Sequence, residues 1–271
     1  MRPMLIGLIL LTAAASDRTA DRKALLAADR ATALDGSAFT DSATYLHPGA
    51  ALVHGASHIT AFLANAGLAR NLQRDPVFAD VSLDGSLGYT WGWTRSEQTR
   101  GKYLACWRKA AGGWRLAAFA GTMPVVDSAA ARLTGKRDAA APVRGRADPR
   151  ELFRADSTFA ALAVARSEKE AFQSYAAQNA VSFGSATQFN EGRQAIGAAF
   201  NDFPTDAVLE WWPLAAEIAG SGDLGCTVGE AEINSLHHYS KYLTIWKRQT
   251  NGTWQFVADG GNERPAPALE H

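Results

Sequence analysis

The feature that most constrains the fold is an internal repeat. Residues 87–92 read Leu-Gly-Tyr-Thr-Trp-Gly and residues 224–229 read Leu-Gly-Cys-Thr-Val-Gly. A second match follows in the same order: residues 102–107 read Lys-Tyr-Leu-Ala-Cys-Trp and residues 241–246 read Lys-Tyr-Leu-Thr-Ile-Trp. An upstream match relates the Asp29 region to the Asp156 region at a shorter separation. Matches in one order with slowly drifting separations indicate a duplicated domain with loop insertions.

The repeat divides the 271 residues into two domains of similar length. The first domain is predicted over 17–124 and the second over 149–267. Between them, residues 125–148 are rich in Ala, Arg, Gly and Pro and show no sustained apolar periodicity, which is typical of a linker.

The two ends are predicted to lie outside the fold. Residues 1–16 combine a basic start, a short apolar run and an Ala-rich exit, which predicts a secretory signal peptide and a periplasmic or secreted protein. The apolar run is shorter than the roughly 20 residues of a membrane-spanning helix, so no membrane association is expected after cleavage. Residues 268–271 are interpreted as the remnant of a tag.

Each copy shows helical patterns first and strand-like patterns afterwards. In the second copy Asp148 and Pro149 are typical of a helix start, and Asn251-Gly252 is typical of a hairpin turn. The predicted helices cover 149–163, 168–177 and 191–200, a brief strand covers 181–183, and the long strands cover 207–219, 224–234, 239–249 and 253–260. This order predicts an α+β fold with helices on one face of a sheet.

These motifs resemble a known superfamily. Gly192-Arg193-x-x-Ile196 at the third helix and residues 242–247 on a late strand are similar to nuclear-transport-factor-2-like proteins, which include ketosteroid isomerases and SnoaL-like cyclases. Residues 221–229 and 254–262 resemble a branch of this superfamily whose function is largely unassigned. The resemblance implies two tandem cone-shaped domains, each a curved antiparallel sheet roofed by helices. It also implies that the two domains pack as a pseudo-dimer, which leaves a further homodimer open.

The ketosteroid isomerase resemblance can be tested residue by residue. The position of the family's general base falls on His47 in the first copy and on Phe183 in the second. The positions of its oxyanion stabilisers fall near Asp29 and at Ala105 in the first copy, and at Thr244 in the second. The isomerase triad is therefore absent from both copies. His47 remains a candidate acid–base residue because imidazole titrates near neutrality.

The second copy offers the fuller set of pocket candidates. Strand alternation places Tyr242, Thr244 and Trp246 on one face, which the resemblance implies is the pocket face. Further candidates on this copy are Trp212 for ligand contact and Glu210 and Glu217 for acid–base chemistry, while Tyr103 and Trp107 are the equivalents in the first copy. A carboxylate among aromatic residues would have a raised pKa.

Asp259 and Asn262 allow two interpretations. They fall at the end of the last strand, where the pocket mouth is expected, and are candidate ligand-binding residues. Their sequence, Asp-Gly-Gly-Asn, is also typical of a tight bend, which is the favoured interpretation.

Charge and cysteine content exclude several classes of partner. The 27 basic and 27 acidic residues give no net charge, which argues against a nucleic-acid partner. Neither Cys106 nor Cys226 has a metal-binding spacing, and both are interpreted as buried free thiols, with an interdomain disulfide as the alternative. No carboxylate completes a metal site with the histidines near His47. No metal and no cofactor are expected.

The sequence favours a binding function. We expect an exported protein that holds a small apolar or aromatic molecule in the pocket of one or both domains. One alternative is a cofactor-independent lyase, isomerase or cyclase that uses a single acid–base residue. A second alternative is a protein-interaction module whose pockets are filled by its own side chains.

Overall fold

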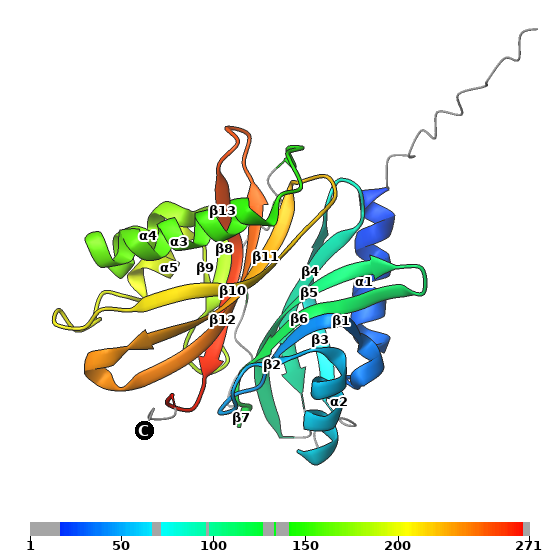
Figure 1. The fold of residues 1–271 in the computed structure, drawn as a ribbon, viewed down its shortest axis with the longest axis horizontal. Helices are drawn as coiled ribbons and strands as arrows, with labels where there is room; N and C mark the ends of the chain where they lie inside the picture. Colours follow the sequence, from blue (N-terminus) through cyan, green and yellow to red (C-terminus); the bar gives the residue numbers. More distant parts are fainter. Residues whose placement is uncertain (1–16, 67–71, 96–97, 127–132, 134–140, 268–271) are drawn as a thin grey trace, which may run out of the picture.

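Two sheets stack face to face at the centre of the molecule, and the helices lie on their outer faces (Figure 1). The computed structural model describes residues 17–66, 72–95, 98–126, 133 and 141–267. The predicted signal peptide, the predicted tag remnant and most of the predicted linker lie outside these described residues. The two tandem α+β domains predicted from the repeat are confirmed, as is their packing as a pseudo-dimer, which the resemblance implies.

The first domain builds one sheet in the order β2-β1-β6-β5-β4-β3, with β7 paired to β5. Its neighbouring strands are antiparallel except for β1 and β6. Strand β7 falls at the start of the segment predicted as linker. The elements are α1 (Arg18–Ala31), η1 (Gly36–Ala38), β1 (Phe39–Leu46), β2 (Val53–His54), α2 (Ala56–Asn65), β3 (Gln73–Val81), β4 (Leu87–Arg95), β5 (Thr99–Ala110), β6 (Gly113–Gly121) and β7 (Val125–Val126).

The second domain repeats this topology in the order β10-β11-β12-β13-β8-β9, with β8 and β13 parallel. Its elements are α3 (Pro149–Ala165), α4 (Glu168–Tyr175), β8 (Ala176–Phe183), β9 (Phe189–Glu191), α5 (Arg193–Ala198), β10 (Glu210–Ile218), β11 (Leu224–Ile233), η2 (Asn234–Leu236), β12 (His238–Arg248) and β13 (Trp254–Glu263). Within the described residues, no helix is long and apolar enough to cross a bilayer.

Local sequence explains where the two long helices begin. Asp17 caps α1 by accepting hydrogen bonds from two backbone N–H groups of the first turn. Asp148 caps α3 by accepting one such bond, from the Arg150 N–H, and Pro149 occupies a first-turn position where it has no hydrogen bond to lose.

The two copies differ by one helix. Between the first helix and the third, the second domain contains α4, whereas the first domain has only the short η1 at the corresponding place. This insertion accounts for most of the drift in repeat separation, which rises between the first helix and the first long strand of each copy. Helix α4 brings Phe172 over the outer face of the second sheet, where its ring packs 4.8 Å from Phe159 on α3.

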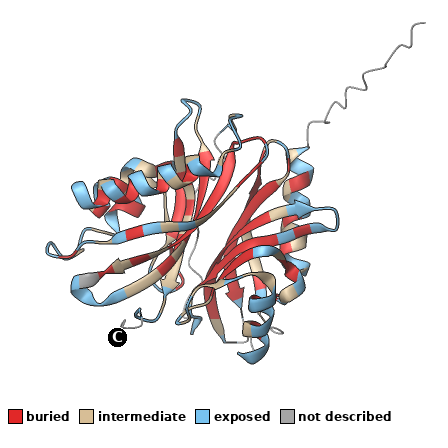
Figure 2. Ribbon diagram, in the orientation of Figure 1, coloured by how far each residue is buried: buried red, intermediate tan, exposed pale blue. Residues whose placement is uncertain are grey.

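The inner faces of the sheets share one apolar core (Figure 2). It includes Tyr89, Trp91 and Leu104 from the first domain and Leu243 and Ile245 from the second, all buried. The outer face of each sheet packs against its own helices in a separate core. The molecule therefore has three apolar layers, and the helix-covered faces are where the predicted pockets would lie.

Polar contacts between the domains follow a pseudo-two-fold axis. Three sets of repeat-related residues exchange equivalent bonds across the interface, so these contacts occur twice with the domains reversed. The ion pair of Lys247 with Asp80 is equivalent to that of Arg108 with Glu217. The bond from the Leu83 N–H to the Asp223 carboxylate is equivalent to that from the Gly220 N–H to the Ser86 hydroxyl. Lys102 donates to carbonyls of the second domain, as Lys241 donates to a carbonyl of the first. These contacts fix the two domains as one unit.

The structure corrects the interpretation of the cysteines. Cys106 on β5 and Cys226 on β11 form a disulfide between the domains, with Cα atoms 6.7 Å apart. The prediction of free thiols is therefore wrong. The two cysteines lie on strands that are not equivalent in the repeat, so the repeat alone does not indicate that they meet. Stacking of the sheets brings β5 over β11, and this contact places the two cysteines close enough to form the disulfide.

The tight bend predicted over 259–262 is also wrong. Strand β13 continues through these residues, with Asp259 opposite Thr244 and Asn262 opposite Lys241 on β12. The glycines serve close packing: a Cβ on Gly261 would lie 2.4 Å from the Lys241 carbonyl oxygen. The extended backbone points Asp259 toward the helices.

Candidate functional site

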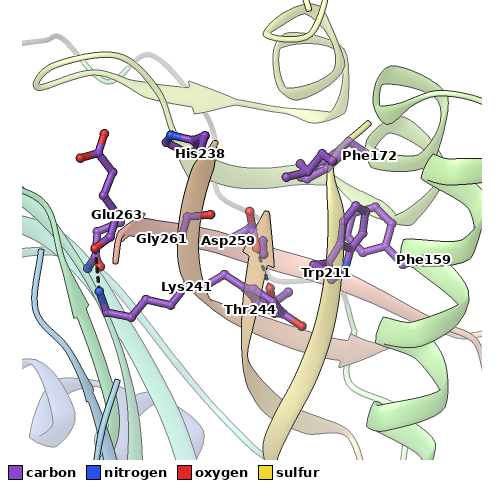
Figure 3. Close-up of a pocket in the computed structure, with 14 residues that line it drawn as sticks. Phe159, Phe172, Trp211, His238, Lys241, Thr244, Asp259, Gly261 and Glu263 are labelled. Atoms are coloured by element: carbon purple, nitrogen blue, oxygen red, sulfur yellow. Dashed lines mark hydrogen bonds between the residues drawn. The ribbon is translucent and has the colours of Figure 1, made fainter. Parts of the chain in front are cut away.

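The second domain contains a cavity of about 260 Å³ between its helices and the outer face of its sheet (Figure 3). Helices α3 and α4 and strands β10, β11, β12 and β13 form its walls. The lining residues are Phe159, Phe172, Leu209, Trp211, Ala231, His238, Ser240, Lys241, Tyr242, Thr244, Asp259, Gly261, Asn262 and Glu263.

One wall of the cavity is aromatic. Phe159 on α3, Phe172 on α4 and Trp211 on β10 pack edge to face or tilted, with ring centroids 4.6 to 5.8 Å apart. Such pairs restrain one another's orientation, so the wall is preformed. It presents flat apolar surface to the cavity.

Asp259 is a carboxyl group that lines this cavity beside Thr244. Its Oδ1 accepts a hydrogen bond of 2.6 Å from the Thr244 hydroxyl on the neighbouring strand. Burial raises the pKa of Asp259 to about 7; the Thr244 bond opposes this shift, and the nearby charge of Asp156 adds to it. A carboxyl group with this pKa is present in both protonation states near neutral pH.

Asp156 is a second buried carboxyl group, placed behind the cavity wall on α3. It accepts hydrogen bonds from the Trp211 indole N–H at 2.9 Å and from the Tyr242 hydroxyl at 3.0 Å. Burial raises the pKa of Asp156 to about 6, against the opposing effect of these bonds and one from Thr227. No ion pair to Asp156 occurs within the described part of the chain.

The corresponding region of the first domain is closed by its own side chains. Asp29 is the repeat partner of Asp156, and it forms an ion pair of 2.6 Å with Arg74, the partner of Trp211. Tyr103, the partner of Tyr242, donates a 2.6 Å hydrogen bond to the same carboxylate. Arg74 also donates to two backbone carbonyls. The carboxylate therefore has a built-in cation.

Two further replacements complete the closure. Phe119 stands where the second domain has Asp259, and Ala105 stands where it has Thr244. Phe119 is buried and stacks on Tyr103, with ring centroids 5.6 Å apart. Within the described residues, the repeat thus holds one filled site, occupied by these buried side chains of the first domain, and one open site in the second.

Of the predicted ligand-binding residues, four line the open cavity: Tyr242, Thr244, Asp259 and Asn262. Trp246 is fully buried beneath it and donates its indole N–H to Thr227. The other predicted residues lie elsewhere: Trp212 is 37% exposed on the opposite face of β10 from Trp211, and Tyr103 and Trp107 are in the core of the first domain.

The three residues proposed for acid–base chemistry do not line this cavity. The carbonyl of His47 lies at the domain interface, where it accepts a bond from Lys241, whereas its ring packs on Tyr45 and Phe62 on the helix-covered side of the first domain. Burial, then the charge of Lys241, lowers the pKa of His47. Glu217 pairs with Arg108 between the sheets, and Glu210 is exposed at the start of β10.

Histidines near His47 do not gather into a metal site. His54 Nδ1 lies 3.3 Å from the Thr44 hydroxyl, and His58 Nδ1 lies 2.9 Å from the His54 carbonyl. Within the part of the chain that the structure describes, no three metal-ligating side chains cluster.

Sequence reasoning missed Asp156 and the aromatic wall. A usable signal for Asp156 was present, because an aspartate recurs at Asp29 and Asp156 among the apolar positions of the first helix in each copy. Phe172 had no counterpart in the first copy, and Trp211 was not distinguished from Trp212 because strand parity cannot be fixed across a bulge. That bulge lies after Pro213.

Comparisons with known proteins concern the fold. No protein-family model matches the sequence, and no curated protein is significantly similar to it. Among solved structures, the chain is similar to a ketosteroid isomerase-like protein from Erwinia carotovora atroseptica (12% identity, 41% of this chain and 92% of that one, TM-score 0.34). It is also similar to an NTF2-like protein with a cystatin-like fold from Novosphingobium aromaticivorans (16% identity, 45% and 88%, TM-score 0.35). A third is ActVI-ORFA from Streptomyces coelicolor (11% identity, 42% and 95%, TM-score 0.34).

Each domain has the α+β roll that the sequence resemblance implies, with helices over one face of a curved sheet. The chain is a tandem of two α+β domains that share one topology. These likenesses describe architecture and assign no activity.

The buried carboxyl group of Asp156 makes a prediction about stability and pH. Its pKa is about 6 in the folded protein, above the ordinary value of 3.8, so the folded state binds the proton more tightly than the unfolded state. The Asp156 contribution to stability is therefore lost as pH rises from about 4 to about 6. Across this pH range, we expect the free energy of unfolding of Asp156→Asn to rise by on the order of 3 kcal/mol relative to that of the wild type. Urea unfolding of both proteins at pH 4, 5, 6 and 7 measures this difference. If the free energies of unfolding of the two proteins changed in parallel with pH, the prediction would be contradicted.

Proposed function

We propose that the second domain binds a small, largely apolar aromatic molecule in its cavity. The observation that carries this proposal is the contrast between the copies. At the same place in the same fold, one domain is filled by Arg74 and Phe119, whereas the other is open and lined by Trp211 and Asp259.

The lining supports a flat ligand with one polar group. Phe159, Phe172 and Trp211 offer apolar surface, and pockets of this kind gain affinity from burying it. Thr244 and Asp259 lie together on adjacent strands and offer a hydrogen-bonding group at one point. A single polar point in an apolar cavity orients a ligand.

Proton transfer is a second candidate function, favoured by the pKa of Asp259. A carboxyl group that titrates near 7 serves as an acid or a base at neutral pH. Asp259 would take a proton from one carbon of a bound molecule and return it to another, or assist an elimination or cyclisation, without a cofactor.

We also propose that the protein is exported. The disulfide between Cys106 and Cys226 supports this proposal because such bonds persist in oxidising compartments. The mass of the N-terminus in protein recovered from its host tests it: a chain that retains residues 1–16 overturns the proposal.

Copying the filled site into the second domain tests the binding proposal. Thr244→Ala with Asp259→Phe reproduces the Ala105 and Phe119 pair, which already packs at the same register in the first domain. We expect the variant to fold and to lose ligand affinity by about 100-fold or more, because the new ring fills the cavity.

The measurement is native mass spectrometry of both proteins purified from the host, followed by extraction of bound compounds. We expect an aromatic compound on the wild type and none on the variant. Empty wild-type protein, or the same compound on both proteins, would overturn the proposal. Urea unfolding of the variant confirms that it is folded.

A further inference from the structure

The charges around the open cavity are unbalanced. Asp259 faces the cavity, Asp156 lies behind Tyr242, and Glu263 lies at the mouth. The basic lining residues are Lys241 and His238, and the Lys241 Nζ is directed away from Trp211, donating to the Glu263 and His47 carbonyls (Figure 3). Among the described residues, no cation lies within bonding distance of Asp156 or Asp259.

The filled site of the first domain shows how this buried carboxylate is neutralised when a cation is present. Its buried carboxylate, Asp29, is neutralised by the guanidinium of Arg74, whose side chain is 2% exposed. In the open domain the equivalent of Arg74 is Trp211, which satisfies Asp156 with a hydrogen bond and brings no charge. The replacement therefore removes a cation from a site that keeps its carboxyl group.

A bound cation would restore the missing charge. Buried carboxyl groups without a counter-charge are costly, and an incoming cation relieves that cost. The aromatic wall adds a second attraction, because the faces of Phe159, Phe172 and Trp211 favour a cation close to them. Carboxyl group and aromatic wall are both within the same cavity of about 260 Å³.

Resting on the proposed binding function, we infer that the ligand of this cavity is an aromatic amine cation whose ammonium group pairs with Asp259. The ring lies against Phe159, Phe172 and Trp211. Asp156 acts from behind the wall by adding negative potential.

Binding of such a cation is coupled to proton release. The titratable groups that face Asp259 are Asp156 from α3, Tyr242, Lys241 and His238 from β12, and Glu263 from β13. Because Asp259 is partly protonated near pH 7, an ammonium group that pairs with it drives the proton off. We expect the amine to bind more tightly as pH rises from 6 to 8.

A matched pair of probes tests the inference. 2-Naphthylmethylamine is protonated at pH 7.5, and 2-naphthylmethanol has the same rings without charge. We expect calorimetric titration to show at least about tenfold tighter binding of the amine. Asp259→Asn should remove this preference while the alcohol still binds. Glu170→Gln, which removes an exposed acid from α4, should leave both affinities unchanged.

A second variant gives an independent check. Trp211→Arg places a guanidinium beside Asp156, where the first domain has Arg74 beside Asp29, and we expect it to weaken the preference for the amine by offsetting the negative potential of Asp156. Equal binding of the two probes by the wild type would overturn the amine inference and leave the proposed binding function standing. Binding of neither probe would overturn both. A preference that survives in Asp259→Asn would overturn the pairing with Asp259.

Discussion

Replacing both Cys106 and Cys226 with alanine is expected to lower the free energy of unfolding by about 4 kcal/mol, since the bond closes a very long loop. The two cysteines are 120 residues apart in the sequence and join the two sheets at the centre of their shared core. Without the bond, the unfolded chain gains freedom while the folded chain keeps its other contacts. Alanine suits the site because the surrounding core is apolar.

Urea unfolding of the wild type and the double variant measures this effect, with and without a reductant. Reductant should lower the stability of the wild type to that of the variant and leave the variant unchanged. Equal stabilities of oxidised wild type and variant would show that the bond does not constrain the unfolded chain.

Arg74→Met is expected to lower the free energy of unfolding by about 3 to 5 kcal/mol, because it leaves a buried carboxylate without its cation. Asp29 is fully buried, and Arg74 also donates to the Asp29 and Thr32 carbonyls, which lose their partner as well. Methionine preserves much of the side-chain volume, so the loss reports mainly on charge and hydrogen bonds.

The second-site change Asp29→Asn provides the control. In the Arg74→Met background it removes the uncompensated charge, and it should recover a large part of the lost stability. Chemical unfolding of the single and double variants measures the coupling. An Arg74→Met protein as stable as the wild type would contradict the assignment of Arg74 as the built-in cation of the first domain.

The repeat and the helix-then-strand order predict two α+β domains with helices on one face of each sheet, and the structure has this organisation. Helix boundaries at Asp148 and Pro149 follow from local capping chemistry, and the stacking of two copies follows from the family resemblance. The disulfide was not predictable in this way, because it depends on which strands of the two sheets cross.

The site was predicted only in part, for physical reasons. Tyr242 and Thr244 follow from the period of two along β12, and both line the cavity. A bulge after Pro213 interrupts the alternation of side chains along β10. When the alternation is counted across this bulge, Trp212 is assigned to the face that Trp211 occupies. Asp259 was read as a bend because its glycine neighbours suit turns, whereas here they permit close strand packing.

The most direct test is a spectrum of the tryptophan indole N–H groups during titration with 2-naphthylmethanol, with Trp→Phe variants for assignment. We expect the Trp211 signal to shift, because Trp211 lines the open cavity. The Trp107 signal should stay in place, since its indole is buried in the filled domain and bonded to Thr90. A shift of Trp107 without a shift of Trp211 would contradict the claim that the second domain holds the working cavity.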